Sequence, residues 1–241
     1  MRKKGKTPIS PDALAALVRL KEGNRRYVDN LSTLNITDSN RRALAVGQQP
    51  FAVVLGCSDS RVPTEVVFDQ GLGELFVIRV AGNIVQPSQI GSVEFAAQNF
   101  GTRLVVVLGH TQCGAIQATL EELQQPAENQ SRNIASIVSC IRPSVEGLLG
   151  TDMSRDDLIY NAVRENVRYS VSALQHGSEI IEDLVDNDGL LRKRIAYLCR
   201  KLKEEERKEL ERTAVARELE RKRIEAEQAA KKAEEERLAA E

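Results

Sequence analysis

The stretch Phe51-Ala-Val-Val-Leu-Gly-Cys-Ser-Asp-Ser-Arg61 begins with five apolar residues and ends with a thiol, a carboxylate and a guanidinium. A second apolar run, residues 104–108, is followed by Gly109-His-Thr-Gln-Cys-Gly114. Short apolar runs of this kind are typical of buried parallel strands. Because α/β proteins place their sites where such strands end, we expect Cys57, His110 and Cys113 to lie together there.

The segments around these runs predict strands that alternate with helices. A further strand is expected at 75–80, and helices at 91–100, from Cys113 to about 123, at 134–149 and after an N-cap at Ser154. The order predicts an α/β fold, with a mostly parallel central β-sheet flanked by helices. An earlier helix begins at Ser10-Pro11, and Gly23-Asn24 is expected to end or kink it.

The donor set Cys57, His110 and Cys113 predicts a zinc site. Thiolate and imidazole suit Zn²⁺, and three protein ligands leave a fourth position open, as a catalytic zinc requires. The remaining cysteines, Cys140 and Cys199, are interpreted as structural or incidental. His176 precedes a glycine at an expected helix end, which is typical of a surface histidine.

Cys-x-Asp-x-Arg at 57–61 and His-x-x-Cys at 110–113 together resemble the motifs of the β-class carbonic anhydrases, specifically their bacterial branch. The resemblance extends from about residue 14 to residue 184. It includes Gly23-Asn-Arg-Arg-Tyr27, the segment 69–79, Ala81-Gly-Asn83 and Glu165-Asn-Val167. It implies a zinc-dependent carbonic anhydrase, in which zinc-bound hydroxide attacks carbon dioxide to give bicarbonate and a proton. It also implies a homodimer or a multiple of dimers, with N-terminal helices lying across a partner subunit.

The resemblance assigns roles to individual residues. Asp59 would accept a hydrogen bond from the hydroxide, and Arg61 would hold Asp59 in place. Three groups would contact the substrate, namely Gln70, the backbone amide of Gly114, and Phe95 reaching in from the neighbouring subunit. For Phe95, packing in the core is an equal alternative.

Two site types occur in this family, and in the closed type Asp59 would become the fourth zinc ligand. The closed type places a tryptophan where this chain has Val54. Together with Gln70, Val54 favours the open type. Arg79 matches an arginine of the closed type, although it could simply serve the fold.

Two rival functions remain at this point. The first is a carbon disulfide or carbonyl sulfide hydrolase on the same scaffold, which the zinc motif cannot separate from a carbonic anhydrase. The second is a non-catalytic, zinc-bearing scaffold whose charged tail binds a partner.

The charges of the 241 residues nearly balance, with 34 Lys and Arg against 35 Asp and Glu. This balance argues against binding to nucleic acid or to a membrane surface. Four unevenly spaced cysteines do not form a disulfide framework, so we expect a cytoplasmic protein. The basic start, residues 1–10, is expected to be a flexible end rather than a signal peptide.

The resemblance weakens near residue 190, so we assign residues 11–190 to the carbonic anhydrase-like domain. The family continues there with a sheet strand, but residues 190–198 contain Arg192-Lys-Arg194, a poor fit to a buried strand. They form either a ragged edge strand or the start of a helix, and we favour the helix. Residues 191–241 then predict a long charged helical tail, either solvated or forming a weak coiled coil or a docking helix for a partner.

Overall fold

A computed structural model describes residues 10–126, 131–187 and 191–194. The chain divides into two compact units, Met1–Ala196 and Tyr197–Glu241. All described residues belong to the first unit. The predicted charged tail from residue 195 onward, Cys199 and most of the basic start lie outside the described residues.

Within the described residues, four parallel strands form the central sheet, in the order β2-β1-β3-β4. Their bounds are Ala52–Gly56 for β1, Leu75–Arg79 for β2, Leu104–Leu108 for β3 and Leu191–Arg194 for β4. The predicted mostly parallel sheet is therefore confirmed. β1 and β3 are neighbours, with Gly56 in register with Leu108. The segments that follow the two strands therefore start side by side at the carboxyl ends of the strands.

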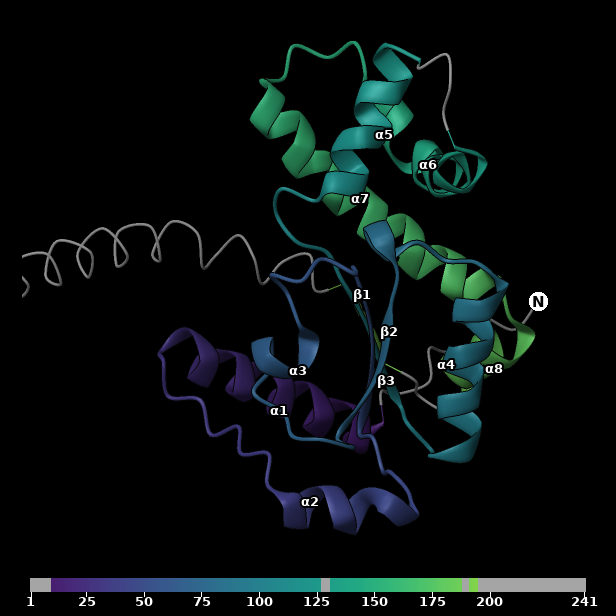
Figure 1. The fold of residues 1–241 in the computed structure, drawn as a ribbon. Coiled ribbons are helices and arrows are strands. Elements are labelled where there is room, and N and C mark those ends of the chain that lie inside the picture. The colour runs from purple at the N-terminus through teal and green to yellow at the C-terminus, as the bar shows by residue number, and fades with distance from the viewer. Residues whose placement is uncertain (1–9, 127–130, 188–190, 195–241) are drawn as a thin grey trace, which may run out of the picture. The chain divides into compact units, whose positions relative to one another are not determined.

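Helices cover both faces of this sheet (Figure 1). α1 (Pro11–Val28) and α3 (Thr64–Val67) lie on one face, and α4 (Pro87–Asn99), α7 (Arg155–His176) and α8 (Glu179–Asn187) lie on the other. α5 (Gly114–Gln124) and α6 (Arg132–Val145) pack beside the first half of α7, beyond the sheet. The shorter elements are α2 (Asp38–Ala43), η1 (Leu44–Val46), η2 (Ala81–Asn83) and η3 (Glu146–Leu148).

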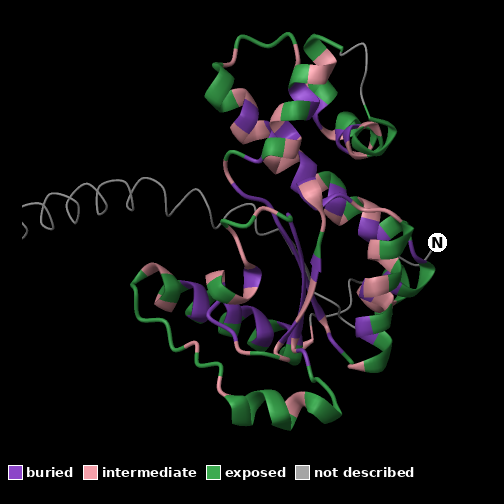
Figure 2. Ribbon diagram, viewed as in Figure 1, coloured by how far each residue is buried: buried purple, intermediate pink, exposed green. Residues whose placement is uncertain are grey.

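Every residue of β1 and β3 is buried, which explains their continuous apolar sequences (Figure 2). Successive side chains of a strand point to opposite faces. Val53 and Leu55 of β1 pack with Val93 of α4 and Leu174 of α7 on one face. The start of α7 is also as predicted, since the Ser154 side chain accepts a hydrogen bond from the backbone N–H of Asp157.

The expectation that the first helix ends at Gly23-Asn24 is wrong, because α1 continues to Val28. Gly23 is instead a point of close approach. A Cβ atom at this position would lie 1.8 Å from the carbonyl oxygen of Phe68 and 2.6 Å from Nε2 of Gln70. The glycine lets α1 contact the loop between α3 and β2.

The preference for a helix from residue 190 is wrong for Leu191–Arg194, which form the strand β4. β4 pairs in parallel with β3, and Val105 lies opposite Arg192. Among the strands that the structure describes, β4 lies at an edge of the sheet. Edge strands commonly contain charged residues, because one of their sides is not paired with another strand. The Arg-Lys-Arg sequence therefore fits the edge-strand alternative.

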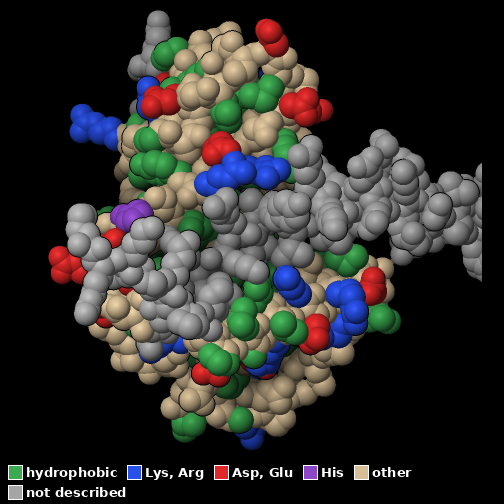
Figure 3. Space-filling model, turned by 180° about the vertical axis from the view of Figure 1, so that it is seen from behind, with side chains coloured by type: hydrophobic (Ala, Val, Ile, Leu, Met, Phe, Trp, Pro, Cys, Tyr) green, Lys and Arg blue, Asp and Glu red, His purple; other side chains and the backbone are tan. Residues whose placement is uncertain are grey.

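Acidic and basic side chains are interspersed on the face drawn in Figure 3, and no broad area of a single sign dominates what is visible. Within the described ranges, no helix has both the length and the apolar character needed to cross a bilayer.

Candidate metal centre

Three donor side chains converge at the carboxyl ends of β1 and β3. Cys57 directly follows β1, His110 lies two residues beyond β3, and Cys113 is the N-cap of α5. Their ligand atoms lie within 4.8 Å of one another, and all three residues are buried. The structure thus brings the predicted set together from two segments more than 50 residues apart.

The spacing of the two sulfurs fits a tetrahedral zinc ion. Zinc–sulfur bonds of about 2.3 Å at a tetrahedral angle place two sulfur atoms about 3.8 Å apart. The Sγ atoms of Cys57 and Cys113 are 3.9 Å apart, far longer than the roughly 2.0 Å of a disulfide. Both cysteines are free thiols.

The imidazole of His110 is oriented as a metal ligand. Its Nδ1 lies 3.0 Å from the carbonyl oxygen of Thr111, so Nδ1 carries the hydrogen and donates it to that oxygen. In the neutral imidazole, the form that binds a metal, Nε2 then holds a lone pair, and this buried atom has no hydrogen-bond partner among the described residues. An unpartnered buried nitrogen costs free energy unless a ligand occupies it, and a metal ion is the ligand that such a backbone-tethered imidazole suits.

The electrostatics of the pair of thiols favour a thiolate. The hydrogen bond from Cys113 is the main cause that lowers the pKa of Cys57 well below that of a free thiol, and the His110 side chain also lowers it. The contact with Cys57, together with burial, raises the pKa of Cys113. Thiolate is the form that binds zinc, so one of the two sulfurs is already prepared for the metal.

Asp59 and Arg61 form a bidentate pair beside the three donors. Nε of Arg61 donates to Oδ1 at 2.9 Å, and Nη2 donates to Oδ2 at 2.7 Å. These bonds, followed by one from the Arg61 backbone N–H, hold the pKa of Asp59 well below its usual range. Nη2 of Arg61 also donates to the carbonyl of Gln112, next to Cys113. Asp59 Oδ2 lies 3.9 Å from Nε2 of His110, so the carboxylate borders the donor set.

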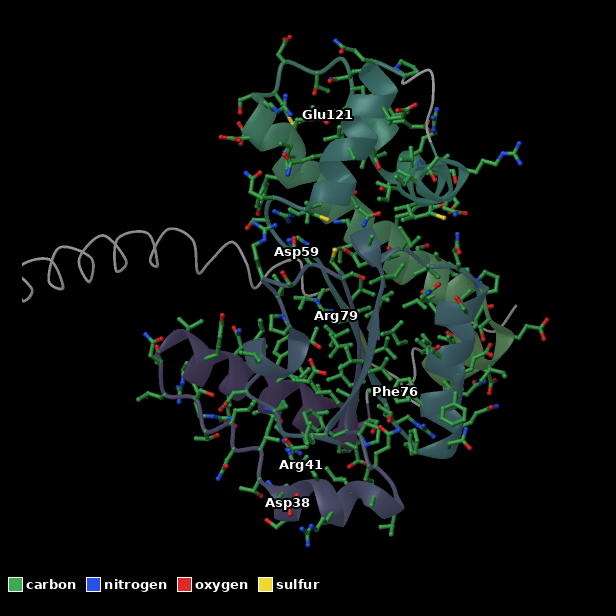
Figure 4. The ribbon with its side chains drawn as sticks, in the orientation of Figure 1. Asp38, Arg41, Asp59, Phe76, Arg79 and Glu121 are labelled. Carbon is green, nitrogen blue, oxygen red and sulfur yellow. The ribbon has the colours of Figure 1, made fainter. Side chains whose placement is uncertain are left out.

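Arg79, at the end of β2, holds the backbone of the Cys57–Asp59 loop. Its Nε donates to the carbonyl of Cys57 at 2.9 Å, and its Nη2 donates to the carbonyl of Asp59 at 2.6 Å. Asp59 and Arg79 lie at the same end of the sheet in Figure 4. The sequence allowed a purely structural role for Arg79. In the structure, Arg79 has such a role at the site itself, because it holds the loop that carries Cys57 and Asp59.

The three predicted substrate contacts lie in different surroundings. Gly114 is the first residue of α5, is exposed, and has open space where a Cβ would be. Gln70 is buried, and its Nε2 donates to the carbonyl of Phe68 at 2.7 Å. Phe95 is 51% exposed on α4 and contacts Phe76 and Phe100. Of the three, Gly114 alone is adjacent in sequence to a donor.

Sequence reasoning missed one contact to a donor. The backbone N–H of Gly82, in η2, donates to the Sγ of Cys57 at 3.3 Å. Gly82 has φ of +71°, where an added Cβ would also lie 2.8 Å from Cδ1 of Ile141. The glycine in Ala81-Gly-Asn83 could have indicated a turn with positive φ, although not the sulfur that it contacts.

The other thiol and imidazole of the described ranges lie apart from this cluster. Cys140 Sγ accepts a hydrogen bond from Nε2 of Gln86 at 3.3 Å. His176 is the last residue of α7, with 60% of its side chain exposed and Nδ1 3.4 Å from an oxygen of Glu182. Both positions agree with the sequence interpretation.

The sequence and the fold match those of known proteins. A family model described as carbonic anhydrase matches residues 52–201. A carbonic anhydrase of Mycolicibacterium smegmatis is 41% identical over 171 residues, which cover 70% of this chain and 80% of the relative. Carbonic anhydrase 2 of Mycobacterium tuberculosis is 37% identical over 180 residues, covering 73% and 84%.

Solved structures agree at the level of the fold. The crystal structure of a β-carbonic anhydrase from the fungal pathogen Aspergillus fumigatus superposes with a TM-score of 0.56 at 26% identity, covering 73% of this chain and 81% of the other. The chain therefore belongs to the carbonic anhydrase family, in its β-class. The predicted family, its bacterial affinity and the enzyme class are confirmed.

Proposed function

We propose that this protein catalyses the reversible hydration of carbon dioxide to bicarbonate and a proton, with Zn²⁺ held by Cys57, His110 and Cys113. The observation that carries the proposal is the buried donor set with its 3.9 Å sulfur separation and the unpartnered Nε2 of His110. Zinc bound there supplies a Lewis acid that brings the pKa of a water ligand toward neutrality, so that hydroxide is available to attack carbon dioxide.

Asp59 and Arg61 orient the nucleophile in this proposal. Arg61 contacts both carboxylate oxygens and keeps Asp59 ionised. The ionised carboxylate then accepts a hydrogen bond from the attacking oxygen, which turns a lone pair of that oxygen toward carbon dioxide. Arg79 fixes the backbone on either side of Ser58, so the carboxylate keeps its place relative to Cys57.

We infer the open site type, in which Asp59 pairs with Arg61 and does not ligate the metal. The two side-chain hydrogen bonds from Arg61, together with its backbone N–H, support this assignment. A carboxylate would have to give up these charge-assisted bonds in order to become a fourth ligand. Val54, buried in β1, fills the position of the tryptophan of the closed type.

Substrate binding is proposed to use the backbone N–H of Gly114, because the start of a helix presents free amides to an oxygen anion. The exposure of Gly114 supports this role. Phe95, half exposed on α4, would line the pocket of a neighbouring subunit. The amide nitrogen of Gln70 is already engaged by Phe68, so Gln70 would contact substrate only through its remaining hydrogen-bonding capacity.

We also propose that the protein is a homodimer or a multiple of dimers in the cytoplasm. Leu14 and Val18 are one turn apart on α1, and 44% and 52% of their surfaces are exposed. An exposed apolar pair on the helix that the family places across a partner supports the assembly. The uneven cysteine pattern and the free thiols support a reducing compartment.

The test is stopped-flow carbon dioxide hydration as a function of pH, on protein with its zinc content measured. We expect about one zinc per chain and activity that a chelator removes and added zinc restores. Cys57→Ser should lose both zinc and activity. Cys140→Ser, a half-buried cysteine outside the donor set, is the matched control and should retain both.

Two outcomes would contradict the proposal in different ways. Full zinc occupancy without hydration at any pH would reject the reaction, and carbon disulfide and carbonyl sulfide would then be tested as substrates. A steep loss of activity below about pH 8 would leave the reaction in place but reject the open site type. Such a loss is what we expect if Asp59 leaves Arg61 at lower pH and becomes the fourth ligand of the metal.

A further inference from the structure

Cys57 receives a hydrogen bond from a turn that lies outside both donor segments. The turn is η2, and its residues Gly82 and Asn83 both have positive φ, at 71° and 45°. The N–H of Gly82 donates to Cys57 Sγ. Glycine adopts a positive φ freely and asparagine tolerates it better than most residues, so the sequence permits this turn, and contacts from its surroundings help to hold it.

Two polar side chains of α7 hold this turn. Nδ2 of Asn166 donates to the carbonyl of Gly82 at 2.7 Å, and Oγ of Ser170 donates to the carbonyl of Asn83 at 2.9 Å. The two residues lie one turn apart on the same face of α7, and each is only 1% exposed. They therefore bind consecutive carbonyls of η2 in an environment without competing water.

The amide of Asn166 has a defined orientation. The carbonyl of Gly82 can only accept a hydrogen bond, so the side-chain nitrogen of Asn166 must face it. Its Oδ1 then lies toward the hydroxyl of Ser144 on α6, 3.4 Å away, although the single hydrogen of that hydroxyl is donated to the carbonyl of Ile141 at 2.7 Å. The hydrogen bond to Gly82 is thus the short contact that this buried amide makes with the turn.

We propose that Asn166 is a positioning residue of the metal centre, which keeps the Gly82 turn in place so that its N–H reaches the sulfur of Cys57. The inference rests on the proposed zinc site. Groups that hydrogen-bond to a ligating atom tune the donor strength and orientation of that ligand. Asn166 acts one step further out and contacts no donor itself.

The experiment compares Asn166→Leu with the parent protein. Leucine has the same branched shape as asparagine, although it is larger, and it cannot donate to the Gly82 carbonyl. We expect the zinc affinity, measured by competition with a chromophoric chelator, to fall about 10- to 100-fold. With Co²⁺ in place of zinc, the thiolate-to-cobalt absorption band should move to longer wavelength, because a sulfur that loses an N–H donor gives up electron density more readily.

Leu174→Ala is the matched control. Leu174 lies on the same helix and is buried in the core, two turns beyond Asn166. Its truncation should lower the midpoint of unfolding but leave the zinc affinity and the cobalt band at parental values. If Asn166→Leu does not fold, Asn166→Ala replaces it, since a smaller side chain removes the donor without overpacking.

Failure of this inference is separable from failure of the proposed function. If the parent protein binds no zinc, the proposed metal site is rejected. The positioning role is rejected if the parent binds zinc and the folded Asn166 variant has the same zinc affinity and cobalt spectrum as the parent. If that variant is merely less stable, as Leu174→Ala is expected to be, then Asn166 is only a packing residue.

Discussion

Gly23→Ala is expected to destabilise the protein, although alanine is the better helix former. Gly23 lies inside α1, with helix continuing on both sides. Intrinsic propensity alone would make the alanine variant about 1 kcal/mol more stable. The added Cβ, however, would lie 1.8 Å from the Phe68 carbonyl oxygen and 2.9 Å from the Phe68 carbonyl carbon. These are backbone atoms, which cannot rotate away as the end of a side chain can.

The size of the effect follows from this contact. Cβ atoms essentially never approach another heavy atom within 3.0 Å, so α1 must move away from the Phe68 loop by roughly 1 Å. Overpacking of a buried site costs about 1–3 kcal/mol. The same movement strains the neighbouring hydrogen bond from Asn24 Nδ2 to the Val67 carbonyl, which is 2.9 Å long. Because the clash is with backbone atoms, we take the upper end of that range, about 3 kcal/mol, and subtracting the propensity gain of about 1 kcal/mol leaves a net loss of about 2 kcal/mol.

Gly91→Ala is the control for this prediction. Gly91 lies within α4, is exposed, and has no heavy atom within 4 Å of the position that a Cβ would occupy. It should therefore gain up to about 1 kcal/mol from propensity alone. Urea unfolding of both variants and the parent, at one protein concentration, measures the two effects. If Gly23→Ala is stabilised like Gly91→Ala, the close approach of α1 to the Phe68 loop is refuted.

Three further predictions concern single contacts. Burial alone would raise the pKa of Asp69, but hydrogen bonds from Ser32, Arg26 and Thr33 hold that pKa well below its usual range. The ionised carboxylate therefore stabilises the fold above its unfolded pKa of about 4, and this stability declines as the pH falls further. In urea titrations, Asp69→Asn should lower the free energy of unfolding by about 2 kcal/mol at neutral pH and weaken its dependence on pH below about 5. If that pH dependence is the same as in the parent, Asp69 is not the group responsible for it. Arg61→Lys, which cannot form the bidentate pair, should lower kcat/KM for hydration about 10- to 100-fold with zinc content unchanged; parental activity would argue against the orienting role. Gly109→Ala would place a Cβ 2.6 Å from Cγ2 of Val167, so we expect it to lower the free energy of unfolding in urea by about 1–3 kcal/mol. An unchanged free energy of unfolding would show that α7 can move aside for the added methyl group.

The parts of the fold that could be predicted from sequence are those set by local pattern. β1 and β3 are buried on both faces, so every position is apolar and the strands are apparent without any knowledge of their neighbours. The donors follow these strands within a few residues, and their chemistry is specific enough to predict a metal site. Ser154 likewise acts within its own helix, as an N-cap.

The parts that could not be predicted depend on contacts between distant segments. Gly23 appeared to be a helix terminator because its packing partner, Phe68, lies 45 residues away in the chain, a separation that no local pattern reveals. Leu191–Arg194 looked unsuited to a strand because a charged run is costly in the middle of a sheet. Their place at the edge depends on the order of all four strands.

The Cys57–Arg61 loop is held by groups from several elements, each with a different target. Arg79 of β2 binds the carbonyls of Cys57 and Asp59, and the N–H of Gly82 in η2 binds the sulfur of Cys57. Within the loop, Arg61 binds the Asp59 carboxylate and reaches the Gln112 carbonyl of the second donor segment. These bonds connect the loop to β2, to η2 and to the second donor segment, so groups outside the predicted ligand set contribute to the placement of the donors. In the proposed open site, these bonds from Arg61 to both carboxylate oxygens would keep Asp59 beside the metal position without making it a ligand.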